Sequence, residues 1–194
     1  MSSKQLILEA IGRNKPAKRV LPDLLYFSSS ENLIEKYTQS VTLNGGTAIG
    51  VATYEEINAY IKENFVEGVE VVSLIPQISG NRDIQEIIEP HDLEKVEVAV
   101  VKGELGVTEN AAVWIPEKNL PHRVLPFIAQ HLIIVVDKNT LVPNMHEAYR
   151  QIHVADDGYG VFIAGPSKTA DIEQSLVIGA HGARSLTVFI MEGH

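Results

Sequence analysis

The chain contains no cysteine among its 194 residues. This absence excludes structural disulfides, thiolate metal sites, an iron–sulfur cluster held by this chain, and a cysteine nucleophile. If electrons pass through the pathway in which the protein acts, another protein must hold the clusters. The sequence identifies no cofactor for this chain.

Long apolar runs are also missing, and no stretch approaches the roughly 20 apolar residues of a membrane-spanning helix. The first ten residues include Lys4 and Glu9 and lack the apolar segment and cleavage site of a secretory signal. We therefore expect a soluble, cytoplasmic protein. Its formal net charge of −9 disfavours binding to nucleic acid, because nonspecific binding depends on contacts with phosphate.

Three common motifs are absent: the Gly-x-Gly-x-x-Gly fingerprint, the phosphate-binding P-loop and the Gly-x-Ser-x-Gly elbow. Their absence disfavours the usual dinucleotide oxidoreductases, nucleotide hydrolases and serine esterases. The histidines have no metal-ligand spacing, since His146 and His153 flank the cation Arg150 on one side of a predicted helix. We expect solvated or hydrogen-bonded histidines and no metal site.

Apolar runs of strand length alternate with helical patterns along the chain, and 45% of its residues are hydrophobic, enough for a substantial core. Capping boxes at residues 28–31 and 53–56 mark two helix starts. The alternation predicts an α/β fold with an open, doubly wound, mostly parallel sheet and helices on both faces. We expect strands at residues 47–52, 69–75, 96–101, 107–115, 132–136, 161–164 and 186–190 and helices at about 31–40, 53–65, 145–152 and 170–179.

The first 22 residues differ from the rest of the chain. They begin with a short amphipathic helix, whose apolar face consists of Leu6, Ile7, Ala10 and Ile11. A basic cluster follows, made of Arg13, Lys15, Lys18 and Arg19. It is either a solvated linker or a contact for a partner. We expect residues 1–22 to form an arm, packed on the domain or on a neighbouring copy, and residues 23–194 to form a single domain.

The run at residues 165–173 lies between two predicted strands and leads into a predicted helix. In such a βαβ unit the loop lies at the carboxyl end of a parallel strand, and the free N–H groups of the helix favour an anion. The expected anion-binding residues are Gly165, Ser167, Lys168, Thr169 and Asp171, with His181 and Arg184 beyond the other helix end. On this geometry the last two lie roughly 15 Å from Lys168. The alternative is that Ser167 or Thr169 only caps the helix.

A second candidate site surrounds Glu109, which is followed by Asn110 and two alanines. Small residues let a substrate approach the backbone closely, and a carboxylate there can act as a nucleophile or a general base. The alternative is a strand end with a solvated glutamate. Trp114, the only tryptophan, is expected to pack against the sheet.

Residues 165–184, from here on the signature segment, closely resemble the signature of the lactate-utilisation protein C family, the LUD-domain proteins. The family usually has arginine where Lys168 stands and often proline where Ala183 stands. Residues 106–114 are similar to the family's strand of small residues around a glutamate, with Ala111 in place of a glycine. Glu109-Asn110 also looks like part of the Ser-Glu-Asn-Gly motif of CoA transferases.

The resemblance implies a NagB/RpiA/CoA-transferase-like fold and membership of a bacterial three-protein system that oxidises L-lactate to pyruvate. Its other two members are iron–sulfur proteins. The leading hypothesis is therefore an accessory or substrate-binding component that holds a small anionic ligand and acts with those partners. One alternative is a CoA-transferase-like or sugar-phosphate-type enzyme that uses Glu109, and another is a non-catalytic scaffold. A homo-oligomer is compatible with each hypothesis.

Overall fold

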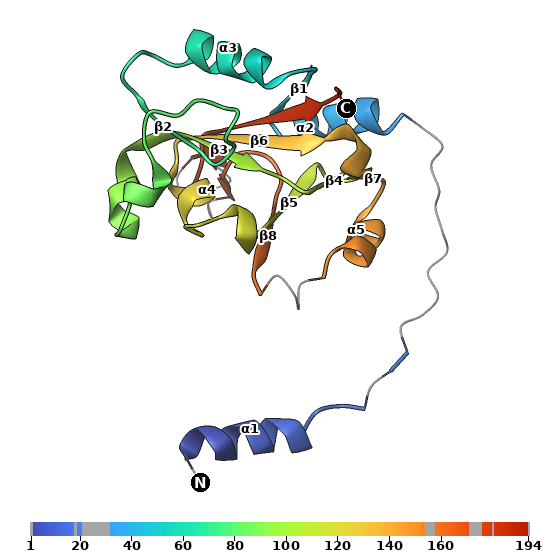
Figure 1. The fold of residues 1–194 in the computed structure, drawn as a ribbon. Helices are drawn as coiled ribbons and strands as arrows, with labels where there is room; N and C mark the ends of the chain where they lie inside the picture. The colour runs from blue at the N-terminus through green and yellow to red at the C-terminus, as the bar shows by residue number, and fades with distance from the viewer. Residues whose placement is uncertain are drawn as a thin grey trace.

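A parallel five-stranded sheet forms the centre of the computed structural model, which describes residues 2–17, 19–20, 32–153, 158–170, 176–179 and 181–193 (Figure 1). The strand order is β1–β11–β6–β3–β2, and every neighbouring pair is parallel. These strands are β1 (Thr47–Val51), β2 (Glu70–Ser73), β3 (Val96–Lys102), β6 (His131–Asp137) and β11 (Ser185–Met191). The predicted fold class, a mostly parallel sheet with helices on both faces, is confirmed.

Side chains of the central strands alternate between two separate cores. In β3, Val98 and Val100 belong to the core beneath α3 (Tyr54–Asn64), whereas Ala99 and Val101 belong to the core on the other face. All four are completely buried. Because both faces are covered, the middle of the strand has no wet side, and residues 98–101 are all apolar.

The helix α3 covers one face, and its start confirms the second capping box. The Glu56 carboxylate accepts hydrogen bonds from the backbone N–H groups of Ala52 and Thr53 at 2.9 and 3.0 Å. Ile57 and Ile61, one turn apart on the same side of α3, are buried against the sheet. The sequence pattern therefore predicted the position of this helix.

The other face carries helices and a second, four-stranded sheet in the order β7–β4–β5–β8 (Figure 1). Its strands are β4 (Leu105–Val107), β5 (Ala112–Pro116), β7 (Leu141–Val142) and β8 (Gly160–Ile163). The helices of the described chain other than α3 are α1 (Ser3–Arg13), α2 (Leu33–Leu43), α4 (Leu125–Ile128) and α5 (Met145–Gln151), and 3₁₀ turns lie at η1 (Ile84–Glu86), η2 (Pro90–Lys95), η3 (Glu117–Asn119) and η4 (Lys138–Thr140). None of the helices within the described ranges is long and apolar enough to cross a membrane.

Two local predictions about these strands are wrong. The single strand expected at residues 107–115 is an antiparallel hairpin, in which β4 and β5 are joined by a turn at residues 108–111. The strand β8 pairs with β5 in the second sheet and not with the central sheet, so it does not open a βαβ unit. Short apolar runs show that a strand exists but not which sheet it joins.

The prediction of a helix at residues 170–179 is also wrong for the described residues. Lys168–Ala170 and Leu176–Ile178 form β9 and β10, an antiparallel pair with Lys168 opposite Ile178. Asp171 lies outside the described residues. Short apolar runs such as Leu176–Ile178 fit a strand and a buried helix equally well by periodicity, and β-branched residues favour the strand.

The hydroxyl group of Tyr37 is buried without a hydrogen-bond partner among the described residues. Tyr37 lies on α2, is 0% exposed and packs against Gly106 of β4, where an added Cβ would lie 3.3 Å from the ring. Burial raises the pKa of the Tyr37 phenol above its usual value of about 10. The core therefore encloses a polar group that contributes no hydrogen bond of its own.

We predict that Tyr37→Phe stabilises the protein by about 1 kcal/mol at pH 7, because it removes an unsatisfied buried hydroxyl and keeps the ring. Above about pH 10 the unfolded wild-type chain loses the phenol proton while the folded chain retains it, so wild-type stability falls. The variant should lack this part of the alkaline loss. Urea unfolding at pH 7 and pH 10.5 measures both effects, and a destabilised variant at pH 7 would contradict the prediction.

Candidate functional site

The two halves of the signature segment lie side by side, because β9 and β10 pair as antiparallel strands. The backbone N–H of Ser167 donates to the carbonyl of Ala183 at 2.8 Å, and that of Gly179 donates to the carbonyl of Ser167 at 3.0 Å. A Cβ added to Gly182 would lie 3.1 Å from the Cβ of Ser167. The predicted separation of one helix length across the signature segment is therefore wrong: residues 181–184 lie beside Ser167.

The signature segment also lies at the opposite edge of the central sheet from the one expected. The backbone N–H of Arg184 donates to the carbonyl of Gln130 at 2.7 Å, immediately before β11 and β6 begin. These are the amino ends of parallel strands, not their carboxyl ends. Among the described residues of the signature segment, neither a helix N-terminus nor a carboxyl edge of the sheet supports an anion site. The anion-binding roles of Gly165, Ser167, Lys168, Thr169, Asp171, His181 and Arg184 stay predictions.

Asn44 joins the signature segment to the hairpin that carries Glu109. Its backbone carbonyl accepts a hydrogen bond from the ammonium group of Lys168, and its side-chain amide donates to the carbonyl of Asn110 at 2.8 Å. Gly165, at a φ of +75°, packs so closely that an added Cβ would lie 2.6 Å from the Asn44 carbonyl oxygen. The two sequence-predicted sites are thus neighbours.

The carboxylate of Glu109 accepts a hydrogen bond from the backbone N–H of Met145 at 2.9 Å. Met145 is the first residue of α5, whose free N–H groups attract negative charge. Glu109 is exposed, and nearby the Ser40 hydroxyl donates to the carbonyl of Thr108 at 2.7 Å, which ties the turn to α2. Glu109 therefore stabilises the start of α5, and its role as a nucleophile or base stays a prediction.

Sequence reasoning missed a hollow of about 340 Å³ at the carboxyl ends of the central strands. We call it the carboxyl-edge hollow. All five parallel strands lead to it, because its lining residues end or closely follow β1, β2, β3, β6 and β11. The lining consists of Tyr54, Ile75, Lys102, Gly103, Glu104, Val135, Val136, Asp137, Thr140 and Met191. Open α/β sheets bind their ligands at this edge.

The charged groups of the carboxyl-edge hollow differ in whether they already have a partner within the protein. The carboxylate of Glu104 forms an ion pair with Lys118 at 2.9 Å. The carboxylate of Asp137 accepts a hydrogen bond from the backbone N–H of Asn139 at 2.7 Å. The ammonium group of Lys102 is exposed, and no described residue pairs with it. Lys102 is thus free to bind an anion in the hollow.

A sequence signal for this hollow existed. Lys102 and Asp137 each directly follow an uninterrupted apolar run, and each run is a predicted strand. In the structure Lys102 pairs with Val135, two residues before Asp137, so both side chains lie on the α3 face of adjacent strands. The pattern predicted the strands, but only the parallel arrangement brings their ends together.

A model of the LUD domain matches residues 34–191. The chain belongs to the LUD domain family. The relatives include lactate utilization protein C of Oceanobacillus iheyensis, which is 30% identical over 106 residues, or 51% of this chain and 45% of that protein. The corresponding protein of Geobacillus kaustophilus is 34% identical over 95 residues, or 46% of this chain and 40% of that protein. The chain thus matches less than half the length of each.

A longer sequence match and a structural match agree with the assignment to this family. Lactate utilization protein C of Anoxybacillus flavithermus is 26% identical over 167 residues, which cover 84% of this chain and 72% of that protein. A crystal structure of a DUF162 family protein from Deinococcus radiodurans superimposes with a TM-score of 0.64 at 16% identity. It covers 82% of this chain and 96% of the other. At this identity the similarity shows a shared fold alone.

Two histidines of the LUD domain are hydrogen-bonded, as expected. His131 Nδ1 lies 2.7 Å from the Ser185 hydroxyl, and His131 Nε2 lies 3.6 Å from a carboxylate oxygen of Glu97. His122 Nε2 lies 3.1 Å from the carbonyl of Ile87. Within the described ranges, no three histidine, aspartate or glutamate side chains are grouped so that they could hold a metal ion.

Ala111 adopts a φ of +59°, a left-handed conformation otherwise found only at glycines among the described residues. It directly follows the Glu109-Asn110 pair, at the position where the resemblance to the LUD-domain proteins predicts a glycine. A residue with a Cβ pays roughly 1–2 kcal/mol for this conformation. The turn thus needs the backbone geometry of glycine even though alanine fills it.

We predict that Ala111→Val destabilises the domain by about 2 kcal/mol more than Ala112→Val does. Both alanines are buried, so both variants overpack the core, but only residue 111 also forces a β-branched side chain into a positive φ. Ala111→Gly should fold with nearly unchanged stability, because relief of the backbone strain offsets the lost methyl group. Urea unfolding of the three variants measures the difference, and equal losses for the two valine variants would contradict it.

Proposed function

We propose that this LUD-domain protein is a component of a bacterial L-lactate oxidation system and that it binds a small 2-hydroxy or 2-oxo acid in the carboxyl-edge hollow. The similarity to proteins named lactate utilization protein C supports the pathway. One structural observation supports the ligand site: all five parallel strands end at one hollow that contains a lysine without a partner among the described residues.

The chemistry of the lining suits such an acid. The ammonium group of Lys102 can bind the carboxylate through a charge-assisted hydrogen bond. The Thr140 hydroxyl donates its proton to the backbone carbonyl of Asp137 at 2.9 Å, so the Thr140 oxygen and the Asp137 carboxylate can accept a hydrogen bond from the hydroxyl group of a 2-hydroxy acid. These groups would bind and orient the acid. Because the chain has no cysteine, the iron–sulfur partners of the system would carry the electrons.

We predict that Lys102→Gln weakens the binding of L-lactate or pyruvate by about tenfold or more, because a charge-assisted hydrogen bond contributes about 1.5–3 kcal/mol. Isothermal titration calorimetry of the purified protein measures this. Lys95→Gln, an exposed lysine outside the hollow, is the control and should bind as wild type. Lys168→Gln separates the two sites. If it abolishes binding while Lys102→Gln does not, the ligand belongs at the signature segment.

The pathway is tested separately by growth. We predict that deletion of the gene abolishes growth on L-lactate as sole carbon source in a strain without a paralogue, because the system then lacks one component. Growth on pyruvate should be unaffected, since pyruvate is the expected product. A plasmid copy of the wild-type gene should restore growth, and one that carries Lys102→Gln should restore it poorly. Normal growth of the deletion strain on lactate would refute the pathway assignment.

A further inference from the structure

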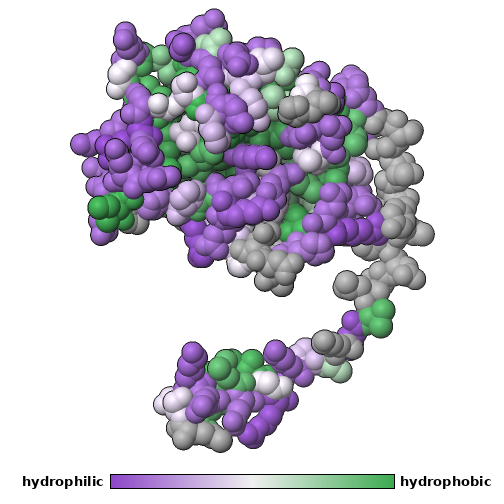
Figure 2. Space-filling view, in the orientation of Figure 1, coloured by the Kyte–Doolittle hydropathy of each residue, from purple (hydrophilic) through white to green (hydrophobic). Residues whose placement is uncertain are grey.

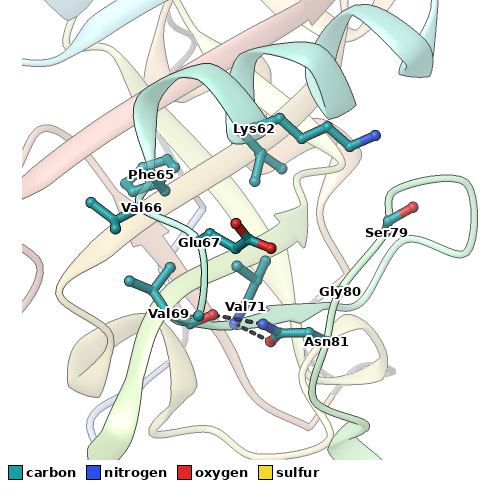
Figure 3. A pocket seen from close by; sticks show the side chains of 11 residues that line it. Lys62, Phe65, Val66, Glu67, Val69, Val71, Ser79, Gly80 and Asn81 are labelled. Carbon is teal, nitrogen blue, oxygen red and sulfur yellow. Dashed lines mark hydrogen bonds between the residues drawn. The ribbon is translucent and has the colours of Figure 1, made fainter.

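A groove of about 500 Å³ lies at the amino edge of the central sheet, between the end of α3 and the loop at residues 79–81 (Figure 3). We call it the amino-edge groove. Its walls are largely apolar, and its apolar lining residues are Ile61, Phe65, Val66, Val69 and Val71. Lys62 and Glu67 supply its charged groups. Val66 is 79% exposed, an unusual position for a valine beside a hollow.

The helix α1 carries an apolar face that no described residue covers (Figures 1 and 2). None of its residues is buried, and its four large apolar side chains, Leu6, Ile7, Leu8 and Ile11, are 53–59% exposed. A helix of only 11 residues is marginal by itself in water. Its stability therefore depends on a surface that covers the apolar face.

The arm and the rest of the chain carry net charges of opposite sign. Residues 1–20 contain five basic residues and one acidic residue, for a net charge of +4. The remaining residues contain 11 basic and 24 acidic residues, for a net charge of −13. The arm is therefore attracted to the body of this protein, its own or that of another copy.

The position of the amino-edge groove favours an arm that comes from another copy of the chain. The arm leads into α2, which begins at Leu33 and packs on β1, one edge strand of the central sheet. Tyr37 and Val41 place α2 on the face opposite to α3. The amino-edge groove lies on the α3 face and beside β2, the other edge strand. The start of α2 and the amino-edge groove of one copy therefore lie on opposite faces and at opposite edge strands of the central sheet, an arrangement that favours the groove of a second copy.

We propose that α1 of one copy occupies the amino-edge groove of a second copy, so that two copies exchange their arms. The helix would be about 16 Å long, and its apolar face would cover the apolar walls. The arm's basic residues would then lie over the acidic body. Because every copy has both an arm and a groove, the exchange closes as a twofold dimer. The match to the LUD domain begins at residue 34, so the arm lies outside the matched domain.

Light scattering across a dilution series tests the proposal, because it measures the molecular mass of the full-length protein in solution. We predict a dimer whose dissociation constant rises at least tenfold in Ile11→Asp and in Val66→Asp, because each variant places a charge in the apolar contact. Val20→Asp and Leu43→Asp are matched controls, since these side chains are 97% and 86% exposed and lie outside the contact. A monomeric wild type, or a dimer unaffected by Ile11→Asp or by Val66→Asp, would overturn the proposal.

A disulfide cross-link tests whether α1 contacts the amino-edge groove and whether the two belong to the same copy or to different copies. Because the chain has no cysteine, the double variant Ile11→Cys/Val66→Cys carries the only two thiols. Under mild oxidation we predict a disulfide-linked dimer on a non-reducing gel and none with Val20→Cys/Leu43→Cys. An intramolecular disulfide in a monomer would show an arm bound to its own groove and would refute the exchange. Sedimentation with anionic phospholipid vesicles that requires Ile11, without a cross-link, would assign α1 to a membrane surface instead.

Discussion

The burial of the central parallel sheet on both of its faces is the constraint on which the rest of the structure depends. Its strands carry apolar side chains on both faces, so α3 must cover one face and a second layer the other. Each layer then has a fixed position. The helix α3 ends above the amino edge and starts above the carboxyl edge, and both hollows lie against it. The second sheet and α2 hold the signature segment and the Glu109 turn on the opposite face.

The two edges of the sheet therefore have different chemistry. At the carboxyl edge, five strands converge on a hollow that offers Lys102 to an anion. At the amino edge, the signature segment is tightly packed: the ammonium group of Lys168 donates to the carbonyl of Asn44, whose side chain donates to the carbonyl of Asn110, and glycines permit close approach at two points. A tightly packed segment with exposed side chains is suited to hold the domain together and to present a surface. A family signature can mark such packing as readily as a ligand site.

Several parts of the fold and of the site could be predicted from the sequence. The strands of the central sheet, the capped start of α3 and the helix α5 follow from local periodicity and capping, which act over a few residues. The antiparallel pairing of β9 with β10 and the turn at Ala111 could not be predicted, because short apolar runs fit either a strand or a helix and alanine does not by itself indicate a positive φ. The sequence singled out the residues of the signature segment but not their placement at the amino edge, and it did not point to Lys102 in the carboxyl-edge hollow.

The sequence by itself determined that this is an α/β domain of the LUD family without a thiolate site, since composition, strand length and the signature segment are local properties. Only the tertiary structure decided which residues share an edge. Lys102 and Asp137 are 35 positions apart, yet they meet because parallel pairing aligns the ends of β3 and β6. Tertiary pairing likewise placed Asn44 between Lys168 and Asn110. Such contacts depend on the register of distant strands, which periodicity within one segment does not encode.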